Sequence, residues 1–174
     1  DAIAVGIGPG AFTGVRLAVA LGQGLALALD RPLIGISTLD VLAAGAIAAE
    51  PGDCVFACID ARMGEVYAAE YLIDANGLPV EKGAAQLSAP SSVELPTAPA
   101  GFARGTGLGA TEGALAARFH APQWQLDATA LPAAADLARL ALRRLCAGDY
   151  VPRPEEVQPL YLRDKVAQTL AERA

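Results

Sequence analysis

The most continuous apolar stretch of the chain lies between Thr13 and Asp30, and its length predicts a helix over residues 13–29. Its long polar side chains are Arg16 and Gln23, which lie seven residues apart and therefore share one narrow stripe. A soluble protein can cover one face of such a helix with its own sheet, and the other face then needs a partner. The pattern indicates a subunit before it indicates a catalyst.

Two ridges of small residues at four-residue spacing run along this helix: Gly14, Ala18, Gly22 and Ala26, and then Ala20, Gly24 and Ala28. Small ridges let another backbone approach closely, and glycines inside a helix cost stability unless such contacts compensate. The helix is therefore either buried within its own domain or, as we favour, held between its own sheet and a partner. We predict an outer, partner-facing stripe of Phe12, Arg16, Val19, Ala20 and Gln23.

The remaining pattern predicts an α/β chain. We expect strands at 2–7, 33–37, 54–60, 65–73 and 102–105, and helices at 39–49 (with Thr38 as N-cap), 111–120, 132–147 and at the end of the chain. The first four elements, in the order strand, helix, strand, helix, imply a parallel pair of strands. Residues 61–64 form a hairpin turn, whereas residues 79–97 and 150–159 are polar, contain proline and are expected to be irregular.

Composition narrows the function. The 174 residues carry a net charge of −6, which argues against an autonomous nucleic-acid binder, so any role on RNA passes through a partner. Three glycines and an arginine argue against a membrane-spanning role for helix 13–29. Cys54 and Cys58 point to one face of a strand as buried thiols, and the odd number of cysteines favours a reducing cytoplasm over a disulfide framework. With one histidine, His120, expected at the surface, we expect no metal, no cofactor and no catalytic residue.

The glycine turn after the first strand invites a nucleotide-binding interpretation. Gly6, Gly8 and Ala11 match the dinucleotide pattern, but Pro9 removes a backbone N–H, and the acidic residue expected near Ser37 is absent. We favour a structural tight turn. A rival hypothesis is a nucleotide-dependent enzyme of the actin-like kinase type, which would use the glycine loops at 8–13 and 105–109.

A charged cluster is predicted at the hairpin tip, where Asp60, Arg62 and Glu65 lie close in sequence. Paired carboxylates there could hold a metal or act in acid–base chemistry. A solvated turn with an internal ion pair is the simpler interpretation.

Four sequence blocks, at 8–16, 35–39, 60–67 and 159–163, resemble in order those of the bacterial TsaB (YeaZ) family. The residues that carry the motif or its structural loops are Gly8, Pro9, Gly10, Thr13, Gly14, Asp60, Arg62, Tyr161 and Arg163. The resemblance implies an actin-like, ribonuclease-H-like α/β fold of two lobes. Residues 1–50 would be the remainder of an incomplete first lobe, and residues 51–174 a second lobe with a carboxy-terminal helix. Family members carry a further amino-terminal segment, which we expect to be missing before Asp1.

The resemblance also implies a function. Such proteins are non-catalytic scaffold subunits that bind and activate TsaD, the transferase that forms N6-threonylcarbamoyladenosine at position 37 of tRNA. The implied partners are TsaD as a heterodimer, TsaE through the complex, a second copy as a homodimer, and tRNA only indirectly, with no membrane. The helix at 13–29 would belong to the partner interface.

Overall fold

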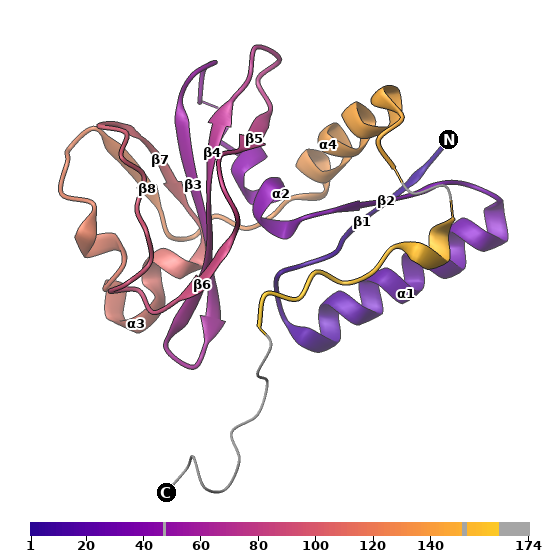
Figure 1. Ribbon diagram of the computed structural model, residues 1–174, viewed down its shortest axis with the longest axis horizontal. Coiled ribbons are helices and arrows are strands. Elements are labelled where there is room, and N and C mark those ends of the chain that lie inside the picture. Colours follow the sequence, from indigo (N-terminus) through magenta and orange to yellow (C-terminus); the bar gives the residue numbers. More distant parts are fainter. Residues whose placement is uncertain (47, 151–152, 164–174) are drawn as a thin grey trace, which may run out of the picture.

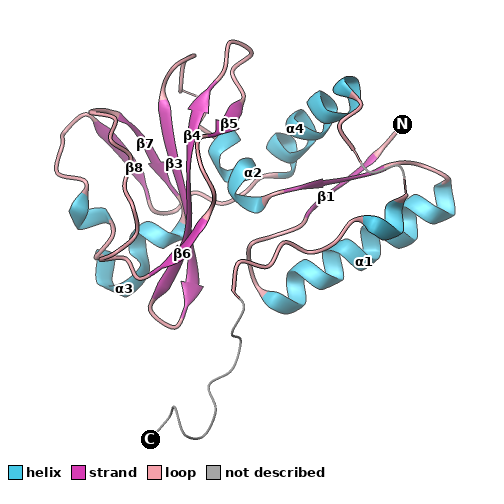
Figure 2. Ribbon diagram, viewed as in Figure 1, coloured by secondary structure: helices cyan, strands magenta, loops and turns pink. Residues whose placement is uncertain are grey.

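The computed structural model describes residues 1–46, 48–150 and 153–163, and it places two β-sheets side by side (Figures 1 and 2). The smaller sheet pairs β1 (Ile3–Gly6) with β2 (Leu33–Ile36) in parallel, as predicted. Helix α1 (Phe12–Leu29) covers one face of this sheet, and α4 (Ala134–Ala147) covers the other. We call this unit the first lobe.

The larger sheet forms the second lobe around a long antiparallel hairpin of β3 (Cys54–Arg62) and β4 (Glu65–Ile73). On one side of the hairpin, β5 (Pro79–Glu81) and β6 (Gln86–Ser88) pair with β4. On the other side, β7 (Gly101–Arg104) and β8 (Trp124–Asp127) run parallel to β3. The sequence pattern missed β5, β6 and β8, whose three or four residues mix apolar and polar side chains, whereas the equally short β1 and β2 are continuous apolar runs.

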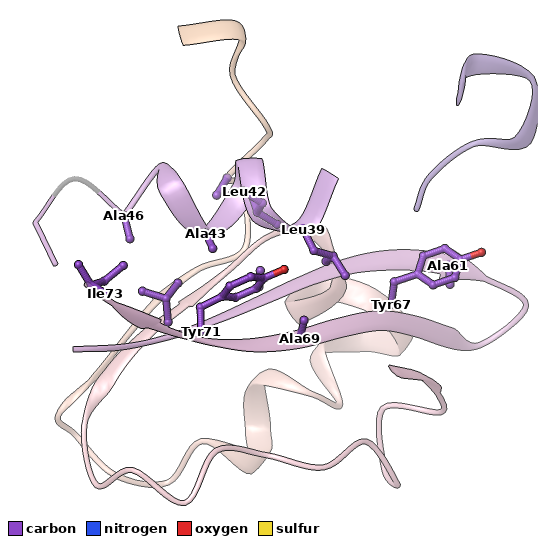
Figure 3. Close-up of a cluster of buried hydrophobic side chains, with 12 residues drawn as sticks. Leu39, Leu42, Ala43, Ala46, Ala61, Tyr67, Ala69, Tyr71 and Ile73 are labelled. Carbon is purple, nitrogen blue, oxygen red and sulfur yellow. The ribbon is translucent and has the colours of Figure 1, made fainter. Parts of the chain in front are cut away.

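Helix α2 (Thr38–Ala44) connects the two sheets. Figure 3 shows Leu39, Leu42 and Ala43 of this helix lying over Tyr71 and its neighbours on the larger sheet. The helix ends well before the predicted residue 49. Ser37, rather than Thr38, caps it by accepting a hydrogen bond from the Leu39 N–H at 3.2 Å.

The end of α2 at Gly45 has a packing cause. A Cβ on Gly45 would lie 3.0 Å from Nη2 of Arg104 and 3.2 Å from Oδ2 of Asp136. Side chains from β7 and α4 therefore leave little space for a side chain at position 45, where the helix ends.

The helix predicted at 111–120 is wrong. Only α3 (Ala110–Gly113) is assigned there, and Thr111 and Glu112 within it have left-handed backbone angles. Short 3₁₀ turns at Thr106–Gly109 and Ala116–Arg118 flank it. Leu108 and Leu115, both fully buried, anchor this irregular segment against Phe56 on the second face of the larger sheet. Burial of these leucines outweighs helix propensity.

The division at residue 50 needs correction. Leu140 and Ala141 of α4 pack in one cluster with Ile34 of β2 and Val41 of α2, so α4 returns to the first lobe. Residues 153–163, called here the strap, include a 3₁₀ turn (Pro154–Glu156) and run back along α1 (Figure 1). The Leu160 N–H donates to the Ile7 carbonyl at 2.7 Å. The expected terminal helix lies outside the described residues.

A partly buried polar cluster joins β2, α2, β4 and α4 at the lobe junction. The Tyr71 hydroxyl donates to Oδ1 of Asp40 at 2.9 Å, and Nη2 of Arg144 lies 3.4 Å from Oδ2 of the same carboxylate. Nη1 of Arg144 donates to the Gly35 carbonyl at 2.8 Å. Burial raises the pKa of Asp40 above its usual value, although Tyr71 and Arg144 both act to lower it.

We predict that Gly105→Ala destabilises the protein by about 2 kcal/mol or more. Gly105 has φ +115°, and a Cβ there would overlap the Cys58 carbonyl and approach Cδ2 of Leu42. Gly52→Ala is the matched control, since Gly52 has φ +93° but open space around it, and should cost about 1 kcal/mol. Urea unfolding compares the two variants, and equal losses of stability would contradict the packing argument.

We also predict a pH dependence that Asp40→Asn removes. Because the pKa of Asp40 is raised in the folded state, the folded protein keeps a proton that the unfolded chain releases. The free energy of unfolding should therefore fall as pH rises from ~4 through the raised pKa. Thermal unfolding measured across this range should show a shallower fall for Asp40→Asn. Tyr71→Phe, which removes a hydrogen bond that lowers this pKa, should move the fall to higher pH.

Candidate interaction surface on helix α1

Helix α1 is seated on its own sheet by one of the two predicted small-residue ridges. Val19, Gly22 and Ala26 are its buried residues, and they face β1 and β2. A Cβ on Gly22 would lie 3.1 Å from Cδ1 of Leu33 and 3.4 Å from Cβ of Val5. Because Gly22 has no side chain, α1 can approach the sheet closely, and this contact compensates for the destabilising effect of glycine inside a helix.

The opposite face of α1 is exposed and apolar. Leu17, Leu21 and Leu25 have 58%, 59% and 55% of their surface exposed. The second small-residue ridge of Ala20, Gly24 and Ala28 runs between them and is exposed as well, and nothing in the described structure lies within 4 Å of a Cβ built on Gly24. We call these six residues the docking face. By length and composition alone α1 could also cross a membrane, a test that core helices of soluble proteins pass as well.

The predicted partner stripe is displaced from this face. Val19 is only 4% exposed, so its place on an outer stripe was wrong. Gln23 donates from Nε2 to the Val157 carbonyl at 3.0 Å, and Nε of Arg16 donates to the Tyr161 hydroxyl at 2.6 Å. Gln23 is partly buried against the strap, whereas Arg16 bonds to the strap and stays exposed. Phe12 and Ala20 of the stripe are exposed.

The hairpin tip is a turn held by ion pairs, as the simpler interpretation predicted. Asp60 accepts the Arg62 backbone N–H at 2.8 Å and pairs with its guanidinium at 3.1 Å. Glu65 pairs instead with Arg163 of the strap at 2.6 Å, and Arg163 also donates to the Ala61 carbonyl at 3.1 Å. The pair between Glu65 and Arg163 joins residues about one hundred apart, which no local pattern could indicate.

The first glycine turn is shaped by contacts within the chain. Gly8 has φ +101°, and a Cβ there would lie 3.0 Å from the Leu160 carbonyl oxygen and 3.4 Å from Cγ1 of Val15. The Gly8 carbonyl accepts from the Thr38 N–H at 2.7 Å. Pro9 and Gly10 complete the turn, and Thr13 and Gly14 lie exposed in the first turn of α1.

The second glycine loop also packs against its own chain. Built Cβ atoms on Gly105 and Gly107 approach the backbone of Cys58 in β3. Gly105 and Gly107 thus serve close packing on the sheet, which accounts for these two glycines without a phosphate ligand, whereas Gly109 has open space around it.

The candidate reactive side chains are two buried cysteines and one exposed histidine. Cys54 and Cys58 are buried, as predicted, and burial raises the pKa of each thiol to about 12, so both are neutral near pH 7. His120 is exposed. Among residues 1–46, 48–150 and 153–163, no group of three or more His, Cys, Asp or Glu side chains is placed to hold a metal ion.

Comparison with known proteins gives the family context of this surface. Residues 1–148 match the family model described as TsaD, tRNA N6-adenosine threonylcarbamoyltransferase. The tRNA threonylcarbamoyladenosine biosynthesis protein TsaB of Escherichia coli K12 is 37% identical over 176 residues, covering 96% of this chain and 72% of the relative. The TsaB of Haemophilus influenzae is 51% identical over 67 residues, covering 38% of this chain and 28% of the relative.

Two solved structures from Pseudomonas aeruginosa share the fold. One, described as an uncharacterized protein with similarity to peptidase YEAZ, superposes with a TM-score of 0.82 at 41% identity over 94% of this chain and 74% of that one. The other, YeaZ, also has a TM-score of 0.82, at 40% identity over 93% and 73% of the two chains. The chain therefore has the mixed α/β, ribonuclease-H-like fold of these structures and belongs to the TsaB (YeaZ) family of tRNA threonylcarbamoyladenosine biosynthesis proteins.

Proposed function

We propose that the chain is a non-catalytic subunit that binds TsaD and activates it for formation of N6-threonylcarbamoyladenosine at position 37 of tRNA. The observation that carries this proposal is the exposed apolar docking face of α1. The match of residues 1–148 to the TsaD family model supports a partnership between related folds.

The chemistry of the docking face favours an apolar helix of the partner. Three half-exposed leucines flank a ridge of alanine and glycine, so a second helix could approach closely along Gly24 while its side chains fill the space beside Leu17 and Leu21. No charged side chain belongs to this face, so docking costs little desolvation. An interface of typical size would bury ~800 Å² on each protein.

Activation would act through the partner's conformational equilibrium. A subunit that binds the competent state of TsaD more tightly than its other states raises the population of that state. The neutral thiols of Cys54 and Cys58 and the exposed position of His120 support a subunit without catalysis of its own.

The same face bears on the other partners. A second copy could cover it as a homodimer, in competition with TsaD, and TsaE would join through the complex. With a net charge of −6, this subunit would meet tRNA only indirectly, and we place its action in the cytoplasm.

We predict that Leu21→Arg lowers the affinity for TsaD from the same organism by at least ~30-fold. The substitution puts a charge at the centre of the docking face, where desolvation would be unfavourable. Leu142→Arg is the matched control, because Leu142 is 61% exposed on α4, on the other side of β1 and β2. Isothermal titration calorimetry gives the affinities, and light scattering of each variant alone reports self-association.

Circular dichroism spectra of both variants should match that of the parent chain, which checks that they stay folded. Equal affinity of the two variants for TsaD would overturn the docking face. If the unsubstituted chain does not bind TsaD but hydrolyses ATP or transfers its phosphate, the kinase-like alternative would be favoured. Arg16→Glu is less suitable as a probe, because it would also release Tyr161 and the strap.

A further inference from the structure

Three of the four sequence blocks meet around one small cavity, of about 210 Å³. Its lining comes from the glycine turn with the start of α1 (Ala11 and Phe12), from the hairpin tip (Arg62 and Met63) and from the strap (Tyr161 and Arg163). A helix that docks on the face of α1 would not fill this cavity, because no residue of the docking face lines it.

The walls expose large apolar side chains to solvent. Phe12, Met63 and Tyr161 have 47%, 61% and 48% of their surface exposed, and all three line the cavity. The rings of Phe12 and Tyr161 lie 6.2 Å apart at a tilt of 36°. Such a gathering of exposed aromatic and thioether groups favours an aromatic occupant.

Arg62, Arg163 and the neighbouring Arg16 stand at the rim against the two carboxylates of Asp60 and Glu65, so the rim keeps one net positive charge although the chain as a whole is acidic. Arg62 and Arg163 belong to the lining, which contains no Asp or Glu, and the Arg62 side chain is 86% exposed. Asp60 and Glu65, just outside the lining, each pair with one of these arginines. Arg16 stands over the Phe12 ring at 3.7 Å, and within the described residues it forms no ion pair.

The start of α1 adds to this positive field. Ala11, at the N-cap position, makes no side-chain hydrogen bond to the helix, and the first turn contains no acidic residue. The first N–H groups of a helix carry partial positive charge, so an acidic group from outside the chain would be favoured at this end.

We propose that the cavity is a docking pocket for one aromatic side chain, carried on an acidic segment of the protein that covers the docking face. The cavity is smaller than the ~300–1,000 Å³ of sites for drug-sized ligands, which suits a single large side chain. The cationic rim selects an acidic segment by charge complementarity. In its choice of partner, this inference rests on the proposed function.

The pocket lies at the amino-terminal end of α1 on the flank that faces the strap, and the same helix carries Leu17 and Leu21 of the docking face further along. A partner helix on that face would bring its flanking segment to the amino-terminal end of α1. An aromatic anchor in a pocket beside a larger apolar contact is a common arrangement of binding hot spots.

The first test uses the only methionine of the chain as a reporter. Met63 lines the cavity, so labelling the methionine methyl group with ¹³C gives one NMR signal at the pocket. The probe is the acetylated and amidated tetrapeptide Glu-Trp-Glu-Glu, with Glu-Ala-Glu-Glu and Lys-Trp-Lys-Lys as controls. We expect a saturable shift with the first peptide and at least about fivefold weaker binding of each control.

The second test uses intact TsaD and a charge reversal. Arg62→Glu should weaken the complex about fivefold, whereas Arg153→Glu, at another well-exposed and ion-paired arginine, should leave it unchanged. Both substitutions lie at exposed side chains, so folding is preserved. The thermal unfolding curves of the two variants check this directly.

The outcomes separate this inference from the proposed function. If Leu21→Arg abolishes the complex while Arg62→Glu binds like Arg153→Glu and no peptide shifts Met63, the docking face stands and the pocket is refuted. If the parent chain ignores TsaD but the acidic tryptophan peptide shifts Met63 saturably, the pocket stands and TsaD is the wrong partner. Equal shifts with all three peptides would also refute the proposed selectivity.

Discussion

Within the described residues, the first lobe depends on one constraint: α1 has more apolar surface than β1 and β2 cover. Val19, Gly22 and Ala26 are buried against these strands, and the three leucines of the docking face remain half exposed on the far side. The free energy gained by hydrophobic burial is roughly proportional to the apolar area removed from water, so covering this exposed face by association would be favourable. The proposed role as a binding subunit rests on that surplus.

The strap covers a flank of α1 that the sheet of β1 and β2 does not reach. It satisfies Gln23 and Arg16 along one flank of α1, fills the space beside Gly8, and reaches the hairpin tip through Arg163. The two lobes are thereby joined at a second place besides the cluster of Asp40, Tyr71 and Arg144. Contacts at two separate places restrict the relative rotation of the lobes more than either would alone.

The sequence allowed α1, the parallel pair, the long hairpin and α4 to be predicted, because each has a strong and regular apolar period. It misled at Val19, which is buried, and it gave no sign that Arg16 and Gln23 bond to the strap. Their true neighbours, Tyr161 and Val157, lie more than 130 residues away, and no local pattern encodes such a contact. The same limit applies to Arg163 with Glu65, and so to the cavity that the three distant blocks enclose.

The strap also sets an order of assembly. Leu160, Tyr161 and Arg163 leave the ribosome more than 130 residues after α1, so the flank of α1 and the cavity beside it have no finished walls on the growing chain. A partner that reads the cavity as well as the docking face would therefore distinguish a completed polypeptide from a nascent one. Recognition of this kind would keep an unfinished subunit out of the complex until synthesis has passed residue 163.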